Sequence, residues 1–181
     1  MKVIKNALPE DFSFYLLKEI KELRKTPIWQ SSTLSWDEGI KESISGSCIV
    51  TSTSDETKDM ILKQVGSYLP PTASNISTMF YIWQPYSGIS KHTDPGYSFA
   101  ATIYLNEYWD VDWGGIFLYY NKKIDWEESE EEYMTDHNNW KVVVPEFGTM
   151  VLNNDETLHM VTPLSPLSPE MRYTIQIWGH S

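Results

Sequence analysis

Residues 98–105 read SFAATIYL, and residues 172–178 read RYTIQIW. Both stretches are short and rich in β-branched and aromatic residues, which is typical of β-strands. Similar stretches, separated by glycines, prolines and Asn/Asp pairs, occupy residues 78–83, 115–120, 141–144 and 149–152. No helical pattern lies between these strands, so they predict a β-sandwich or barrel and not alternating strand–helix units.

The N-terminal part of the chain has a different pattern. Apolar residues at helical spacing predict a helix within residues 1–25, with Asp11 as its cap and Pro27 as its stop. A second helix is predicted over residues 54–68, where two prolines follow. The stretch between residues 26 and 46 is turn-rich and predicts no defined element.

The composition restricts the classes of function. The chain has 181 residues, the size of one domain, and carries 25 acidic against 14 basic residues, a net charge of −11. This balance disfavours binding to phosphate backbones, so we expect no nucleic-acid partner. Cys48 is the single cysteine, so no internal disulfide can form, and we expect a cytoplasmic protein. We find no secretory leader and no apolar stretch of about 20 residues, so we expect no membrane segment.

Two of the histidines are distinguished by their positions. His92 lies two residues before Asp94, and residues at this spacing point to the same side of an extended chain. His159 begins another apparent strand, far along the sequence. Two histidines and one carboxylate from separate strands form the ligand set of non-haem iron(II) sites. The alternatives are a surface pair of His92 and Asp94, and a histidine at position 159 that belongs to the core or to a loop.

Arg172 leads directly into the apolar last strand. A buried arginine needs an anion, and its planar guanidinium can bind a carboxylate through two parallel hydrogen bonds. The far carboxylate of a 2-oxoacid that chelates iron would be such an anion. The alternative is an exposed arginine at a sheet edge that pairs with an acidic loop.

The order of these residues resembles that of the 2-oxoglutarate and iron(II)-dependent oxygenases, most closely the prolyl-4-hydroxylase catalytic family with the oxygen-sensing prolyl hydroxylases. The resemblance covers about residues 78–180, and its motifs are His92-Thr93-Asp94, TIYLN at 102–106, WGGIFLY at 113–119, GTMVL at 148–152, His159 and RYTIQIW at 172–178. It implies a mainly β fold with N-terminal helices and a double-stranded β-helix, or jelly-roll, core. We expect a single domain over residues 1–181, with helical N-terminal support in 1–76 and the jelly-roll catalytic core in 77–181.

The resemblance also implies the metal site and its cofactors. His92, Asp94 and His159 match the iron ligands, and Arg172 matches the partner of the distal carboxylate of 2-oxoglutarate. The implied cofactors are Fe(II), 2-oxoglutarate as cosubstrate and O2, with ascorbate as a candidate reductant. Related halogenases leave the carboxylate position free for chloride, so Asp94 predicts hydroxylation.

Three further residues match positions around the cosubstrate. Tyr104 matches a tyrosine whose hydroxyl assists at the distal carboxylate, and Trp178 matches an aromatic residue that borders the cavity. Trp83 stands where the family usually has the tyrosine of a Tyr-x-Pro-Gly motif. A cosubstrate contact there would use the indole N–H, which is only a donor. Tyr81 and Met79 are expected on the same strand face.

The substrate is the least determined part of the prediction. The resemblance favours a prolyl residue in a peptide or protein, and the alternative is a free amino acid or another small-molecule metabolite. Two non-catalytic alternatives are a jelly-roll binding module and a degenerate oxygenase scaffold. The sequence predicts no oligomeric state.

Two further stretches are expected to form loops. The region 109–140, with an acidic run at 127–132, is expected to cover the substrate entrance. Residues 163–169 contain three prolines and are expected to form a surface loop before the last strand.

Overall fold

The computed structural model describes all residues except 36–40, 42, 72, 123–135, 155 and 181. Its strands are β1 (Lys2–Ile4), β2 (Gln30–Ser31), β3 (Ile44–Gly46), β4 (Ile49–Ser52), β5 (Asn75–Trp83), β6 (Gly88–His92), β7 (Tyr97–Tyr104), β8 (Phe117–Tyr120), β9 (Trp140–Val143), β10 (Met150–Asn153), β11 (His159–Val161) and β12 (Arg172–His180). Its α-helices are α1 (Glu10–Leu23), α2 (Ser32–Ser35) and α4 (Asp55–Val65), and its 3-10 helices are η1 (Gly66–Tyr68), η2 (Val111–Trp113) and η3 (His137–Asn139).

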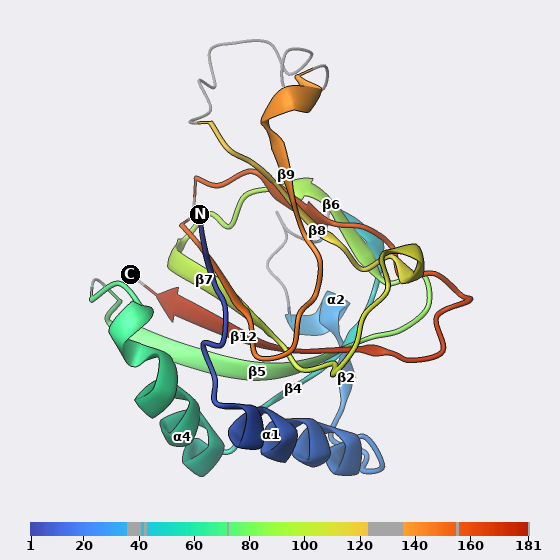
Figure 1. Ribbon diagram of the computed structural model, residues 1–181. Coiled ribbons are helices and arrows are strands. Elements are labelled where there is room, and N and C mark those ends of the chain that lie inside the picture. The colour runs from blue at the N-terminus through green and yellow to red at the C-terminus, as the bar shows by residue number, and fades with distance from the viewer. Residues whose placement is uncertain (36–40, 42, 72, 123–135, 155, 181) are drawn as a thin grey trace.

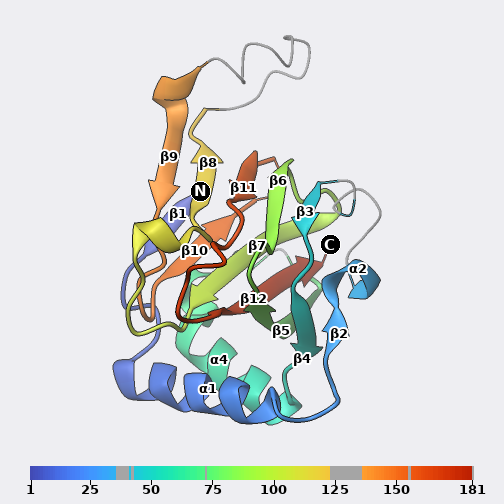
Figure 2. The ribbon, with the colours of Figure 1, turned by 90° about the vertical axis from the view of Figure 1, so that its right-hand side faces the viewer.

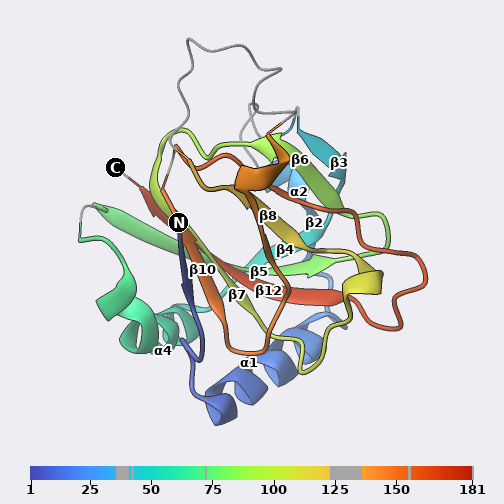
Figure 3. The same ribbon diagram turned by 45° about the horizontal axis from the view of Figure 1, so that its top comes forward.

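Within the described chain, the strands form two antiparallel sheets that face each other (Figures 1 and 3). The larger, seven-stranded sheet has the order β1-β10-β7-β12-β5-β4-β2, and the smaller, five-stranded sheet has the order β3-β6-β11-β8-β9. Most neighbours are far apart in the sequence, so the chain crosses repeatedly from one sheet to the other. This arrangement is a jelly roll, which confirms the predicted fold class.

The two longer helices cover the outer face of the larger sheet (Figures 1 and 2). Successive residues of a strand point to opposite faces, so Ile175 and Ile177 of β12 share the outer face. They pack in one apolar cluster with Ile20 of α1 and Ile61 of α4, and all four side chains are fully buried. The N-terminal helices therefore pack on the outer face of the larger sheet.

The inner face of the larger sheet packs against the smaller sheet. Tyr81 of β5, Tyr104 of β7 and Val151 of β10 lie in a second apolar cluster with Phe117 of β8 and Val161 of β11. Cys48 is also buried in this cluster. Side chains that point inward from β5, β7 and β10 therefore share the space between the sheets.

The predicted cap of the first helix is wrong. Pro9 occupies the N-cap position, no side chain of the described residues caps the helix, and Asp11 already lies in the first turn. The Asp11 carboxylate instead accepts a hydrogen bond from the backbone N–H of the next residue, at 2.9 Å. Proline supplies a backbone angle compatible with a helix start, so the helix begins before the expected cap. The helix ends before Pro27, as predicted, and the second predicted helix is present as α4 followed by η1.

The N-terminal segment contributes strands as well as helices. β1 pairs with β10, β2 and β4 extend the larger sheet beyond β5, and β3 pairs with β6 of the smaller sheet. These strands contain only two to four residues each, too few to show a periodic pattern in the sequence. Both sheets therefore depend on residues that precede β5.

The structure describes one of the two predicted loops completely and the other in part. Residues 163–169 form no strand, and Leu167 is 87% exposed, which confirms a surface loop. Leu164 within it is buried against Trp109 and Ile116, so the loop is anchored at one point. The acidic run at 127–132 lies outside the described residues. Among the helices that are described, none is long and apolar enough to cross a membrane.

Candidate metal centre

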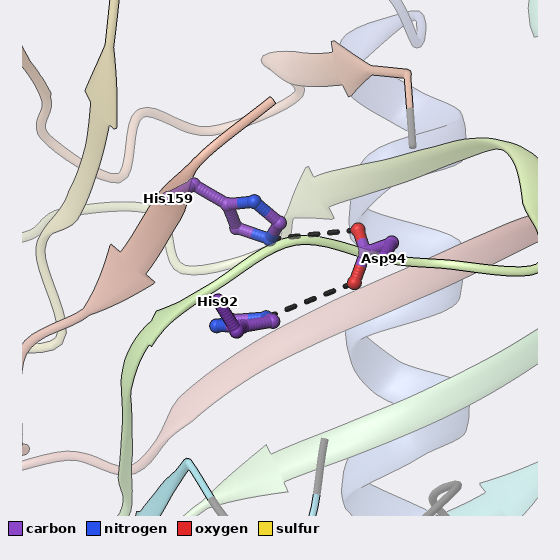
Figure 4. A group of neighbouring side chains, drawn as sticks. All are labelled: His92, Asp94 and His159. Atoms are coloured by element: carbon purple, nitrogen blue, oxygen red, sulfur yellow. Dashed lines mark ion pairs between the residues drawn. The ribbon is translucent and has the colours of Figure 1, made fainter. Parts of the chain in front are cut away.

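His92, Asp94 and His159 meet at one point (Figure 4). His92 ends β6, His159 begins β11, and the two residues are register partners in neighbouring antiparallel strands. Asp94 lies two residues beyond β6, directly before a turn. His92 Nε2 lies 3.7 Å from Asp94 Oδ1, and His159 Nε2 lies 3.5 Å from Asp94 Oδ2. One potential ligand atom of each side chain lies within 4.8 Å of the others.

Both imidazole rings are oriented by their second nitrogen. His92 Nδ1 lies 2.7 Å from the carbonyl oxygen of Ser90, and His159 Nδ1 lies 2.8 Å from that of Thr157. A carbonyl oxygen can only accept, so each Nδ1 carries the proton and each Nε2 keeps its lone pair. These lone pairs face Asp94, which is the tautomer that a metal-binding histidine requires.

The triad is withdrawn from water. The side chains of His92, Asp94 and His159 are 8%, 1% and 7% exposed. Burial lowers the pKa of His92 to about 4, with a further lowering by His159 and an opposing effect of Asp94. His92 is therefore neutral at neutral pH and can act as a ligand.

The carboxylate of Asp94 has one satisfied and one unsatisfied oxygen. Oδ2 accepts a hydrogen bond from Asn153 Nδ2 at 2.8 Å. Oδ1 is buried and has no hydrogen-bond partner among the described residues. A buried carboxylate oxygen without a partner is costly, and a divalent cation would satisfy it together with both imidazole lone pairs. Two histidines and one carboxylate suit Fe(II), so the residues fit the metal that the sequence predicts.

Arg172 lies in the same space between the sheets, and it is fully buried. None of its three guanidinium nitrogens has a hydrogen-bond partner among the residues that the structure describes. Its guanidinium carbon lies 4.9 Å from the ring centroid of Trp83 and 5.1 Å from that of Tyr104. The alternative of an exposed edge arginine is excluded. A buried guanidinium without a hydrogen-bonded partner is suited to a bound anion.

Two buried hydroxyl groups near Arg172 in the fold also lack a hydrogen bond of good geometry. The hydroxyls of Tyr104 and Thr149 are buried, and neither makes a hydrogen bond of good geometry within the described part of the chain. Burial raises the pKa of Tyr104 and lowers the pKa of Arg172, and the attraction between these two groups opposes both shifts. Tyr104 ends β7, and its backbone N–H donates to the carbonyl oxygen of Thr149 at 3.0 Å, so the two residues are neighbours. Arg172, Tyr104 and Thr149 therefore form a group of unsatisfied donors, which we call the anion subsite.

A cavity lies beside the triad, lined by Tyr81, Trp83, Thr102, Phe117, Gln176 and Trp178 among others. Trp83 connects the cavity with the anion subsite, because its ring lines the former and lies over Arg172 of the latter. Its indole N–H donates to the hydroxyl of Thr174 at 3.1 Å. Trp178 packs against Tyr97, with ring centroids 4.6 Å apart.

Sequence reasoning did not identify Asn153 or Thr149. The predicted strand 149–152 ended one residue before Asn153, and nothing in the sequence shows which residues face a loop of the opposite sheet. Asn106 was also not singled out. Its side-chain oxygen accepts from the Tyr173 N–H at 2.7 Å, which holds the start of β12 beside Arg172. Period-two alternation from Val151 would place Thr149 and Asn153 on the inner face, and alternation from Tyr104 would place Asn106 there, but this pattern does not identify their partners.

The other two histidines lie elsewhere. His137 is exposed in η3. His180 lies at the end of β12, where its Nε2 is 3.1 Å from the Ser77 hydroxyl. Neither residue belongs to the group of potential metal ligands found among the described residues.

A family model described as the 2OG-Fe(II) oxygenase superfamily matches residues 76–180. No curated protein sequence matches the chain significantly. Among solved structures, a Pseudomonas putida prolyl-4-hydroxylase is similar with a TM-score of 0.73 at 16% identity, over 99% of this chain and 92% of that one. A Trichoplax adhaerens prolyl hydroxylase in complex with a hypoxia inducible factor peptide has a TM-score of 0.70 at 18% identity, over 99% and 82%. The α-ketoglutarate-dependent carbocyclase SnoK from nogalamycin biosynthesis has a TM-score of 0.71 at 14% identity, over 99% and 79%.

Proposed function

The chain belongs to the 2OG-Fe(II) oxygenase superfamily, and we propose that it hydroxylates a C–H bond, with a prolyl residue of a peptide or protein as the foremost substrate class. The observation that carries this proposal is the presence of two groups of buried polar atoms, one of potential metal ligands and one of hydrogen-bond donors. One oxygen of Asp94 and one nitrogen of each histidine lie within 4.8 Å of one another, and Arg172 is fully buried without a hydrogen bond of good geometry among the described residues. A divalent cation and a dianionic 2-oxoacid would satisfy both groups together.

Each group has a separate role in this proposal. His92, Asp94 and His159 would hold Fe(II), and Arg172 with the Tyr104 hydroxyl would bind the distal carboxylate of 2-oxoglutarate. Bound Fe(II) would supply the reaction with O2 that couples oxidation of 2-oxoglutarate to succinate and CO2 with hydroxylation of the substrate. The chain itself orients the bound groups and keeps water away from them.

The surroundings of Arg172 support a rigid anion subsite. Trp83 and Tyr104 place their rings beside the guanidinium, which restricts its position. Gly115 adopts a φ of +61°, and a Cβ atom there would lie 2.9 Å from Arg172 Cδ. The backbone therefore passes close to the arginine stem, and only glycine leaves room for it.

The substrate class rests on two supports. The motifs quoted above resemble the prolyl-4-hydroxylase family, and solved prolyl hydroxylases have the same fold at TM-scores of 0.73 and 0.70. The net charge of −11 would favour a basic peptide through electrostatic steering. A small-molecule substrate is the second candidate, because a carbocyclase from nogalamycin biosynthesis shares the fold with a TM-score of 0.71.

The single, buried cysteine supports a cytoplasmic location as part of this proposal.

Succinate formation tests the proposal directly. The purified protein is incubated with Fe(II), ascorbate and 2-oxoglutarate, and with proline-containing peptides of basic or acidic flanks or with free amino acids. We expect either the peptides or the free amino acids to stimulate succinate release. Mass spectrometry should show that the substrate has gained one oxygen atom. The His159→Ala variant should lose both signals, because it lacks one of the ligands.

The same material separates the enzyme from the non-catalytic alternatives. A binding module or a degenerate scaffold would not bind stoichiometric Fe(II). If the wild-type protein binds no Fe(II) under anaerobic conditions, the proposed function is wrong. If it binds Fe(II) and only small molecules stimulate succinate release, the prolyl assignment is wrong and the second candidate replaces it.

A further inference from the structure

Asn153 brings a side chain of the larger sheet into the metal centre. It is the last residue of β10 and is only 4% exposed. Its Nδ2 donates to Asp94 Oδ2 at 2.8 Å. The opposite amide orientation would set the Asn153 carbonyl oxygen against a carboxylate, which is repulsive, so the orientation of the amide is determined.

Asp94 is held differently from the two histidines. His92 and His159 lie on paired strands, and a backbone carbonyl orients each ring. Asp94 lies in the connection between β6 and β7, which has no regular structure at this residue. Within the described chain, its carboxylate accepts a hydrogen bond from Asn153 and its Oδ1 has no partner. The orientation of the carboxylate therefore depends on Asn153.

We propose that Asn153 is a positioning residue that engages Asp94 Oδ2, so that Asp94 offers only Oδ1 to the metal; this inference rests on the proposed function. A carboxylate can bind a cation through one oxygen or through both. Fe(II) held by three protein ligand atoms would need its remaining positions for a chelating 2-oxoacid and for O2. A second bond from Asp94 would occupy one of them. Oδ2 lies 3.5 Å from His159 Nε2, so the hydrogen bond from Asn153 would compete with the metal for this oxygen and would keep that position free.

Metal affinity provides a test that does not depend on turnover. Asn153→Leu preserves the approximate volume of the side chain but removes the donor. The dissociation constant of Mn(II), measured anaerobically from the electron paramagnetic resonance signal of the free ion, should rise by about tenfold to hundredfold, the usual effect of removing a group that orients a ligand. The visible spectrum of bound Co(II), which reports the number and geometry of ligands, should also change.

Thr102→Val is a matched control. Thr102 lines the same cavity, and its hydroxyl donates to Gln176 Oε1 at 2.8 Å, so this variant also loses a buried hydrogen bond. It does not remove a contact with the triad, and its Mn(II) affinity and Co(II) spectrum should remain those of the wild type. Circular dichroism confirms folding of each variant. If Asn153→Leu does not fold, Asn153→Ala is measured with the same readouts.

The outcomes separate this inference from the proposed function. If the wild-type protein binds neither Mn(II) nor Co(II), the proposed function fails and the inference falls with it. If the wild type binds both ions and the Asn153 variant binds them with the same affinity and spectrum, only the inference is refuted. Equal losses in the Asn153 and Thr102 variants would refute it as well, because any buried hydrogen bond would then have the same effect.

Discussion

Replacing Arg172 by methionine tests whether the buried guanidinium binds 2-oxoglutarate. The guanidinium of the native side chain lies against the rings of both Trp83 and Tyr104, and its nitrogens make no hydrogen bond of good geometry among the described residues. Methionine retains a long unbranched stem for packing against these rings but removes the charge and the donors. The substitution therefore separates anion binding from packing more cleanly than truncation to alanine does.

The expected effect on cosubstrate binding is large. Without Arg172, the distal carboxylate of 2-oxoglutarate would be buried without its partner, which costs about 2–5 kcal/mol. Because about 1.4 kcal/mol corresponds to a factor of ten, the apparent KM for 2-oxoglutarate should rise at least about thirtyfold. The melting temperature without cosubstrate should not fall, because the substitution replaces a buried charge that has no ion pair among the described residues by an apolar group.

Two assays and two control variants complete this test. Succinate release at varied 2-oxoglutarate gives KM, and Mn(II) titration should give an unchanged dissociation constant, since Arg172 is not a ligand. Arg172→Lys should fall between the wild type and the methionine variant, because it keeps the charge but loses the planar donor pair. Arg24→Met replaces the other arginine, which is exposed after α1, and should keep the wild-type KM. An unchanged KM in Arg172→Met would show that this arginine is structural and would refute the cosubstrate assignment.

Three further predictions follow from other buried groups. Burial lowers the pKa of His92 to about 4, below its value in the unfolded chain. Between about pH 6.5 and pH 4 the unfolded chain therefore binds more protons than the folded protein. The unfolding free energy of the metal-free protein should fall as the pH falls through this window. Urea unfolding at pH 7 and pH 5 measures this, and a pH-independent result would contradict it. Burial raises the pKa of the Cys48 thiol to about 12. A thiol reagent at pH 8 should therefore label the protein only after unfolding. Rapid labelling of the native protein would contradict this prediction. Gly115→Ala should lower the unfolding free energy by about 1–3 kcal/mol, because the φ of +61° at this position disfavours alanine. It should also raise the KM for 2-oxoglutarate, because the new methyl group would contact Arg172. A KM equal to that of the wild type would exclude this contact as a determinant of cosubstrate binding.

The long central strands could be predicted from the sequence because their residues alternate between two apolar environments. β5, β7 and β12 lie inside the larger sheet, and both of their faces are covered, so β-branched and aromatic residues accumulate in them. β2 and β3 could not be predicted, because two or three residues carry no period and their pairing depends on partners far along the chain.

The candidate ligands could be predicted for a different reason. His92 and Asp94 are close in sequence, so local geometry alone brings their side chains together, and the motif order adds His159. Asn153 could not be predicted in this way. It contacts Asp94 only because β10 of the larger sheet lies opposite the connection after β6, and that relation depends on register and on the packing of the two sheets.

The metal centre and the anion subsite depend on different parts of the fold. Arg172, Tyr104 and Thr149 all belong to the larger sheet or adjoin it, on the neighbouring strands β12, β7 and β10. The triad comes from the smaller sheet and its connection to β7, and Asn153 ties that connection to the larger sheet. A cosubstrate that reaches both groups must therefore span the interface between the sheets. The separation of its two binding points is determined by the apolar packing between them, through side chains such as Phe117 and Val151, and not by any single motif.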